Sequence, residues 1–210
     1  MQLIGMLDSP YVRRVAISLD CLGIPFEHKA VSVFSTFEQF QRINPVVKAP
    51  SFICDDGEVL MDSSLILQFA QTKAVNGKSL WSLDAKEIQH QLNLVGLALA
   101  ACEKSVQIIY ERNWRPTEFQ YEPWLKRVTG QLLAAYQGLE QGINTRPHLV
   151  EGPLNQASIT SAVAWQFTQS LLAHVVMATD YPCLTKLSAR LEQTAVFIKY
   201  PPVGPGVPKN

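Results

Sequence analysis

The sequence predicts an α/β domain followed by an all-α bundle of helices. In the first 72 residues the apolar spacing changes repeatedly between that of a strand and that of a helix. Beyond residue 84 only helical spacing recurs, and prolines separate the helical segments. We therefore expect an α/β domain at residues 1–72, a linker at 73–84, a helical domain at 85–198 and a Pro/Gly-rich tail at 199–210.

The first half of the α/β domain alternates strand and helix. "QLIGM", residues 2–6, is typical of a buried strand, and the helical spacing that begins at Pro10 ends at Gly23. "FEHKAVSV", residues 26–33, alternates like a second strand. A short helix is expected at residues 36–43, ahead of an Asn-Pro pair that breaks it.

The second half of this domain predicts a hairpin and a helix. "SFIC" at residues 51–54 and "EVLM" at residues 58–61 flank Asp55-Asp56-Gly57, a sequence that suits a tight turn. A helix then begins at Asp62 or Ser63 and continues to about residue 71. The predicted order is β-α-β-α-β-β-α, a parallel unit extended by an antiparallel hairpin.

The rest of the chain predicts a helical bundle without strands. Helical spacing covers residues 85–112, 122–144, 158–178 and 183–193. The final ten residues, "PPVGPGVPKN", contain four prolines and two glycines, so an extended or mobile end is expected.

Charge and composition exclude several classes of partner. The chain has 18 basic and 18 acidic residues and no block of like charges, so nucleic acid and anionic membranes are not expected partners. It opens on "MQLIGML" without the pattern of a signal peptide, and its longest apolar stretch, residues 94–102, is too short to cross a bilayer. A cytoplasmic protein is expected.

The cysteines suggest a reducing compartment. Cys21, Cys54, Cys102 and Cys183 are scattered, with no CxxC or metal-finger spacing. We expect isolated, buried thiols and no metal site.

Three short motifs stand at the ends of predicted elements: "SPYVRR" from residue 9, "NPVVKAP" from residue 44 and "MDSSLI" from residue 61. Their order, followed by an all-helical domain, resembles the cytosolic glutathione transferases across essentially the whole chain, and the bacterial serine-type members most of all. The resemblance implies a thioredoxin-like first domain that binds glutathione, no metal, a homodimer and a role in detoxification.

Ser9 has two readings. A serine before proline commonly caps a helix, and the residues alone favour that role. The resemblance implies that the Ser9 hydroxyl donates a hydrogen bond to the sulfur of glutathione and lowers the pKa of its thiol. On that reading Ser9 is catalytic without being the nucleophile.

The resemblance also implies a glutathione-binding set. Pro50 would follow a cis peptide bond, and the backbone of Ala49 would pair with the cysteinyl backbone of glutathione. Lys48 would meet the glycyl carboxylate, or else be an ordinary solvated lysine. Asp62 would face the γ-glutamyl ammonium and Ser63 its carboxylate, roles that are compatible with simple helix capping.

Two features of the helical domain remain open. Ser158 stands where the family has the cap of its core helix and can still cap it. Ser161 replaces the acid of the usual capping box, so the reciprocal bond is expected to be lost or weakened. The family places the acceptor pocket between the Ser9 loop and the first long helices, which makes Tyr110 and Trp114, with Ile108 and Arg112, candidates for its wall. All four would equally suit the bundle core or a dimer surface.

Three functions remain possible. The first is a glutathione transferase that activates the thiol of glutathione for attack on a small electrophile. The second is a glutathione-dependent peroxidase or disulfide reductase, which a serine in place of cysteine at the activating position disfavours. The third is a non-catalytic glutathione-transferase-like binding module, since a fold alone does not determine a function.

Overall fold

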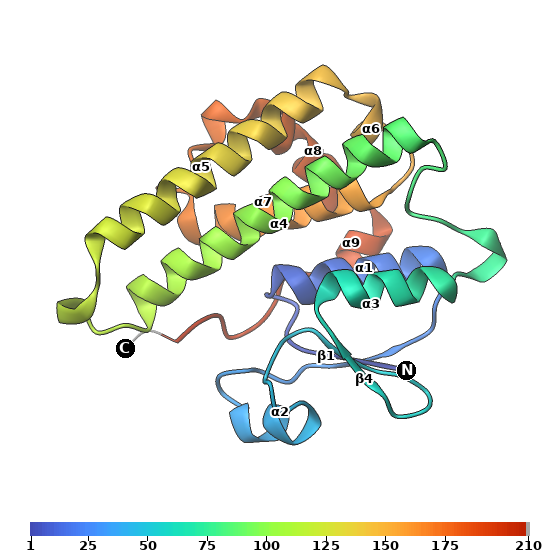
Figure 1. Ribbon diagram of the computed structural model, residues 1–210, viewed down its shortest axis with the longest axis horizontal. Helices are drawn as coiled ribbons and strands as arrows, with labels where there is room; N and C mark the ends of the chain where they lie inside the picture. The colour runs from blue at the N-terminus through green and yellow to red at the C-terminus, as the bar shows by residue number, and fades with distance from the viewer. Residues whose placement is uncertain (209–210) are drawn as a thin grey trace. The chain divides into compact units, whose positions relative to one another are not determined.

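The structure is a computed structural model that describes residues 1–208 of the chain. It contains two compact units: Met1–Leu80 together with Thr194–Gly206, and Trp81–Gln193. The first unit is a mixed sheet with helices and the second is helical (Figure 1), so the predicted fold class is confirmed.

The sheet of the first unit has four short strands. They are β1 (Gln2–Ile4), β2 (Glu27–Lys29), β3 (Ser51–Ile53) and β4 (Val59–Met61), in the order β2-β1-β3-β4. β1 is parallel to β2 and antiparallel to β3, and β3 is antiparallel to β4. The element order is the predicted β-α-β-α-β-β-α.

The second strand is shorter than the sequence predicts. β2 ends at Lys29, whereas the alternation of apolar residues runs to residue 33. The chain turns there, because the Val31 amide donates to the Lys29 carbonyl at 2.9 Å. Val31 then leaves the ladder and packs with Ile4 and Phe40 in an apolar cluster.

Helices cover both faces of this sheet. α1 (Pro10–Leu22) and α3 (Ser63–Thr72) pack together on one face, and α2 (Phe37–Ile43) lies on the other (Figure 1). The cluster beneath α2 also contacts Val47 and Ala49. The loop before β3 is therefore packed against the core of the unit.

The chain returns to the first unit at its end. A short helix, α9 (Ala195–Lys199), packs on α1. The buried Arg13 of α1 donates from Nε to the Tyr200 carbonyl at 2.8 Å. Residues 194–206 thus belong to the first unit, whereas the sequence predicts a helical domain that reaches residue 198 and a separate tail.

A charged cluster fixes the same segment near the other end of α1. Asp20 accepts hydrogen bonds from the Tyr200 hydroxyl at 2.9 Å and from the Lys199 ammonium. Burial raises the pKa of Asp20, but these hydrogen bonds outweigh it and the net pKa is lowered. The contribution of Asp20 to stability is therefore present above its ordinary pKa of 3.8 and is lost as the pH falls through the lowered value.

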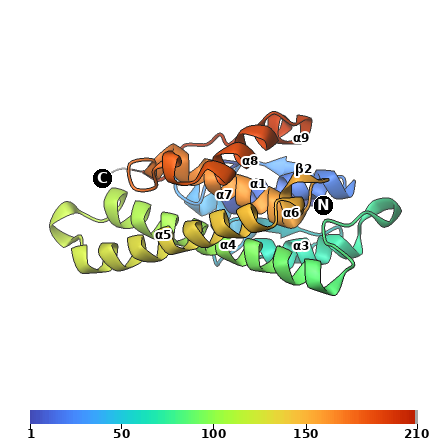
Figure 2. The same ribbon diagram turned by 90° about the horizontal axis from the view of Figure 1, so that it is seen from above.

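The second unit is a bundle of helices. They are α4 (Ala85–Asn113), α5 (Glu122–Thr145), α6 (His148–Glu151), α7 (Gln156–Leu172) and α8 (Pro182–Glu192), and two single turns, Thr117–Phe119 and Ala178–Asp180, lie between them. The long helices α4 and α5 run side by side (Figure 2), and α4 also packs on α7.

The core helix α7 differs from its prediction at both ends. Asn155 is its N-cap: the Ser158 amide donates to Asn155 Oδ1 at 3.0 Å, and the Ser158 hydroxyl accepts from the Asn155 amide at 3.1 Å. A reciprocal box is present between Asn155 and Ser158, one turn earlier than expected, so the prediction that Ser158 is the cap of this helix is wrong. The helix ends at Leu172 rather than residue 178, because the chain turns there and the Gln169 side chain binds the Val176 carbonyl.

The helix α4 is 29 residues long. Among the described residues it is the single helix long and apolar enough to span a bilayer, although its longest apolar stretch is only nine residues by sequence. It packs against α5 and α7, and 44% of its most apolar window is buried. These are the features of a core helix.

Candidate functional site

Three loops meet at one end of the sheet in the first unit. The register pairs Ile4, at the end of β1, with Ser51, at the start of β3, and pairs Ser51 with Met61, at the end of β4. The loops after β1 and β4 and the loop before β3 therefore begin at the same edge. They carry Ser9, Lys48–Pro50 and Asp62–Ser63.

A close contact joins two of these loops. A Cβ atom at Gly5 would lie 2.6 Å from Val12 Cγ2 and 3.3 Å from Ala49 Cβ, and the φ of Gly5 is +139°. Only glycine allows β1 to end this near to α1 and to the loop before β3. The Ser9 loop and the Ala49 loop are thereby neighbours.

Ser9 lies between a turn and a helix. Its amide donates to the Met6 carbonyl at 3.2 Å, and its hydroxyl oxygen accepts from the Val12 amide at the long distance of 3.5 Å. Ser9 is thus the N-cap of α1, with Pro10 as the first helical residue. Within residues 1–208 the Ser9 hydroxyl proton has no acceptor, so this O–H group remains available at a helix N-terminus.

The loop before β3 is held by a buried asparagine that the sequence does not single out as functional. Asn44 donates from Nδ2 to Ser51 Oγ at 2.8 Å, and its Oδ1 accepts from the Val46 amide at 3.0 Å. Ser51 Oγ in turn donates to the Lys48 carbonyl at 2.8 Å. The Ala49–Pro50 peptide bond is cis, as the family resemblance implies.

Asp62 and Ser63 begin α3. Asp62 has a φ of +70° and caps the helix by accepting from the Ser64 amide at 2.9 Å. Its other carboxylate oxygen lies 3.8 Å from Lys48 Nζ, and both side chains are about half exposed. Such an exposed ion pair contributes little to stability, about 0–1 kcal/mol. Either side chain can therefore leave the pair and bind a charged group of a ligand at a small cost in free energy.

Arg14 is a candidate site residue that the sequence motifs do not single out. Its side chain is 2% exposed, and its guanidinium donates to Ser63 Oγ at 3.0 Å and to Ser64 Oγ at 3.3 Å. It places a positive charge beneath the N-terminus of α3, where the helix dipole has the same sign. The signal was present in "SPYVRR", but only the packing of α1 on α3 reveals which arginine faces Ser63.

Tyr110 and Trp114 lie near the end of α4 in the second unit. Their rings meet edge to face with centroids 5.8 Å apart, and the side chains are 39% and 45% exposed. Burial raises the pKa of Tyr110. Neither residue lines the cavity of the helical unit.

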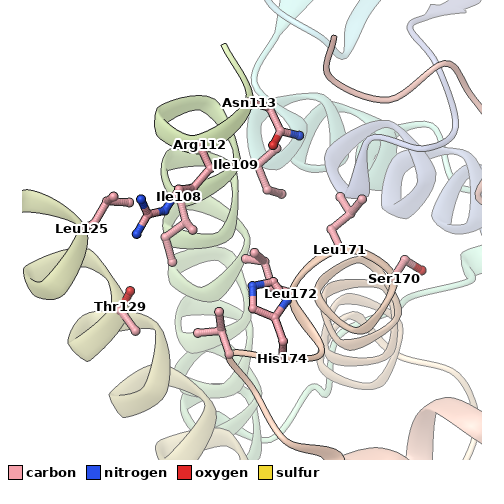
Figure 3. Close-up of a pocket in the computed structure, with 11 residues that line it drawn as sticks. Ile108, Ile109, Arg112, Asn113, Leu125, Thr129, Ser170, Leu171, Leu172 and His174 are labelled. Atoms are coloured by element: carbon pink, nitrogen blue, oxygen red, sulfur yellow. The ribbon is translucent and has the colours of Figure 1, made fainter. Parts of the chain in front are cut away.

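That cavity has a volume of about 620 Å³ and lies between α4, α5 and the end of α7 (Figure 3). Its walls are mainly apolar, with Ile108, Leu125 and Leu172 among them. Arg112 extends from α4 toward Leu125 on α5 (Figure 3), and it forms a two-pronged ion pair with Glu122 at 2.7 and 3.1 Å. Of the four sequence candidates, Ile108 and Arg112 line this cavity.

Three of the four thiols have a raised pKa, which makes them less reactive. Burial, together with the nearby charge of Asp20, raises the pKa of Cys21 to about 11, and burial also raises the pKa of Cys54 and of Cys183. Only Cys102 is fully buried, so the expectation of four buried thiols is wrong for the other three. In the described part of the chain, no three His, Cys, Asp or Glu side chains are grouped so as to hold a metal ion.

Part of the sequence is similar to a known protein family. Residues 3–77 match the family described as Glutathione S-transferase, N-terminal domain. The first unit is therefore similar in sequence to the N-terminal domain of glutathione S-transferases. The matched residues include β2, β3 and β4, two of the three residues of β1, and the three loops at the sheet edge.

Relatives extend the similarity beyond the glutathione S-transferase N-terminal domain. An uncharacterized GST-like protein of Escherichia coli K12, YibF, is 26% identical over 207 residues, which cover 96% of this chain and 98% of YibF. Glutathione S-transferase U3 of Arabidopsis thaliana is 26% identical over 122 residues, 53% of this chain and 54% of its own.

Solved structures share the fold of both units. A glutathione transferase family member from Pseudomonas fluorescens Pf-5, crystallised with bound glutathione, superposes with a TM-score of 0.83 at 25% identity and covers 97% of this chain and 99% of its own. A glutathione S-transferase from Methylobacterium radiotolerans in complex with glutathione sulfonate gives a TM-score of 0.89 at 23% identity, with 100% and 98% coverage.

We expect that Asn44→Ala lowers the free energy of unfolding by about 1–3 kcal/mol, because Asn44 is 5% exposed and its loss leaves buried groups of the loop unpaired. Urea denaturation measures this change. The exposed Asn93 of α4 provides the matched control, and Asn93→Ala should change the stability by no more than about 0.5 kcal/mol. Equal effects of the two substitutions would contradict the role given to Asn44.

Proposed function

We propose that the protein is a glutathione transferase of the serine type, in which Ser9 stabilises the thiolate of bound glutathione for attack on a small electrophile. The observation that carries this proposal is the Ser9 hydroxyl itself. It stands at the N-terminus of α1, its proton has no acceptor among residues 1–208, and it shares the sheet edge with the loops of Ala49 and Asp62.

The chemistry follows from this position. The amide groups and dipole of a helix N-terminus favour negative charge, and a hydrogen bond from Ser9 to the sulfur favours the thiolate over the thiol. The proton of the thiol leaves to solvent. The thiolate then supplies the electron pair of the new carbon–sulfur bond, and the leaving group of the electrophile departs with the pair of the bond that breaks.

The neighbouring loops supply groups for the rest of glutathione. The Ala49 backbone can pair with the cysteinyl backbone in the manner of an added strand. Asp62 and Lys48, which pair weakly with each other, can take the ligand's ammonium and glycyl carboxylate instead. Ser63, with Arg14 beneath it, can hold the γ-glutamyl carboxylate.

Reduction of peroxides or disulfides is the weaker alternative. It would favour a low-pKa thiol near the site, whereas burial raises the pKa of Cys21 in α1 to about 11. A non-catalytic binding module is the other alternative, and it would bind glutathione without lowering the pKa of its thiol. Homodimerisation and a cytoplasmic role in detoxification are further proposals, of which the mass of the protein in solution tests the first.

The deciding experiment is an ultraviolet titration of the glutathione thiol in complex with the protein. We expect a bound thiol pKa well below that of free glutathione, together with conjugation of a general electrophile. Cys21→Ser should leave both unchanged, since the transferase mechanism does not use that thiol. An unshifted thiol pKa would favour the binding module, and loss of activity in Cys21→Ser would favour the reductase.

A further inference from the structure

The last residues of the first unit run along α1 toward the Ser9 loop. Arg13 holds the segment at the Tyr200 carbonyl, and Asp20 holds the side chains of Lys199 and Tyr200. The Tyr200 ring also stacks on Phe26, with centroids 5.9 Å apart. From these anchors residues 201–206 continue to the turn that precedes α1.

The segment ends on Asp8. The Gly206 amide donates to Asp8 Oδ2 at 2.8 Å. Gly204 packs against the same carboxylate so closely that a Cβ atom there would lie 2.2 Å from Asp8 Cγ and Oδ2. Two separate observations, a hydrogen bond and a close approach that only glycine permits, therefore place the segment on one side chain.

Asp8 immediately precedes Ser9 in the turn. That turn is closed by the Ser9 amide, which donates to the Met6 carbonyl. It is joined to the helix by the Arg13 amide, which donates to the Ser9 carbonyl at 3.0 Å, and by the long 3.5 Å bond from the Val12 amide to the Ser9 hydroxyl. Of these three local bonds, the one that involves the hydroxyl itself is the weak one. The contacts of Gly204 and Gly206 with Asp8 add a tertiary restraint on the residue that immediately precedes Ser9.

We propose that residues 201–206 form a C-terminal latch that positions the Ser9 hydroxyl by holding Asp8. Asp8 is then a positioning residue that acts through Ser9. This inference rests on the proposed function, because the position of Ser9 matters for chemistry only if the hydroxyl meets a thiolate. Misplacement of a group by about 1 Å is enough to slow a reaction about a hundredfold.

Two substitutions are expected to disrupt the contact between the latch and Asp8, one on each side of that contact. Asp8→Ala removes the acceptor of the Gly206 amide, and Gly204→Ala forces the Asp8 carboxylate away from it. Gly152→Ala is the matched control, because its Cβ would have only one neighbour, at an ordinary 3.8 Å. Gly152 lies in the helical unit, outside the proposed site.

Each latch variant is expected to raise the pKa of bound glutathione's thiol by up to about one unit and to lower kcat about three- to tenfold, the scale of one hydrogen bond. Affinity for S-methylglutathione, whose sulfur cannot ionise, should stay within about twofold. Gly152→Ala should change none of these. A latch variant whose thiol pKa and kcat equal those of the wild type would overturn the proposal.

A double variant tests the coupling directly. The three atoms nearest to a Cβ at residue 204 all belong to the Asp8 carboxyl group. In the Asp8→Ala background, Gly204→Ala should therefore have no further effect on kcat or on the thiol pKa. Additive effects of the two substitutions would contradict a latch that acts through Asp8.

Hydrogen exchange of the protein without glutathione separates the latch from the proposed function. In both latch variants the Gly206 amide and the Val12 amide, which donates to Ser9, should exchange about three- to tenfold faster than in the wild type. Unchanged exchange at Val12 would overturn the latch. If the wild type binds no glutathione, the proposed function fails, and exchange at Val12 alone then decides whether the latch holds Ser9.

Discussion

Replacing Ser9 with alanine is expected to raise the pKa of bound glutathione's thiol by about one to two units and to lower the conjugation rate about 10- to 100-fold. The reason is the loss of one hydrogen bond to a charged sulfur, a contact of about 1.5–3 kcal/mol. Affinity for glutathione should fall little, because the other loops of the sheet edge are untouched. Titration of the bound thiol and steady-state kinetics measure the two effects.

Ser9 also caps α1, so the controls must separate capping from chemistry. Ser9→Thr keeps a hydroxyl that can both cap and donate, and it should retain a low thiol pKa. Asp84→Ala removes the N-cap of α4 and should cost about 0.5–2 kcal/mol of stability without moving the thiol pKa. Full activity of Ser9→Ala with every electrophile tested would disprove the role given to this hydroxyl.

Arg13→Leu is expected to lower the free energy of unfolding by about 2–4 kcal/mol. Arg13 is 1% exposed, donates to the carbonyls of Tyr200 and Phe197, and places its guanidinium 5.3 Å from the centre of the Phe197 ring. Leucine fills part of the space but leaves two carbonyl groups without this donor, and unpaired buried groups are costly. Urea denaturation monitored by circular dichroism measures the loss.

Arg42 of α2 is the control, since it is an exposed arginine of the same unit. Arg42→Leu should change the stability by no more than about 0.5 kcal/mol. If Arg13→Leu were equally harmless, the end of the chain would contribute nothing to the stability of the first unit, and the latch would have no anchor.

The order of the elements could be predicted because it depends on local signals. Pro10 at the start of α1 and the Asp-Asp-Gly turn between β3 and β4 determine their surroundings within a few residues. Predictions were poorer where tertiary contacts decide. β2 ends early because Val31 leaves the sheet to pack on Phe40, and the cap of α7 is Asn155, a turn earlier than the family pattern suggests.

Some residues of the candidate site could likewise be identified from the sequence, whereas others are revealed only by tertiary contacts. Ser9, Ala49 and Ser63 could be named because each belongs to a short motif at the end of an element. Arg14 and Asp8 could not, because their roles depend on partners 49 and 198 residues away in sequence. No spacing rule connects a residue before the first helix with a glycine near the end of the chain.

The return of residues 194–206 to the first unit also bears on how the protein is made. Residues 1–80 are synthesised well before Phe197 and Tyr200. The hydrogen bonds from the Arg13 guanidinium to the carbonyls of these two residues can therefore form only after the rest of the first unit has been made. During synthesis the helical segment can fold as soon as it emerges, because its contacts are closer in sequence. The first unit therefore cannot complete its contacts until residues 194–206, which follow the helical unit in sequence, have been made.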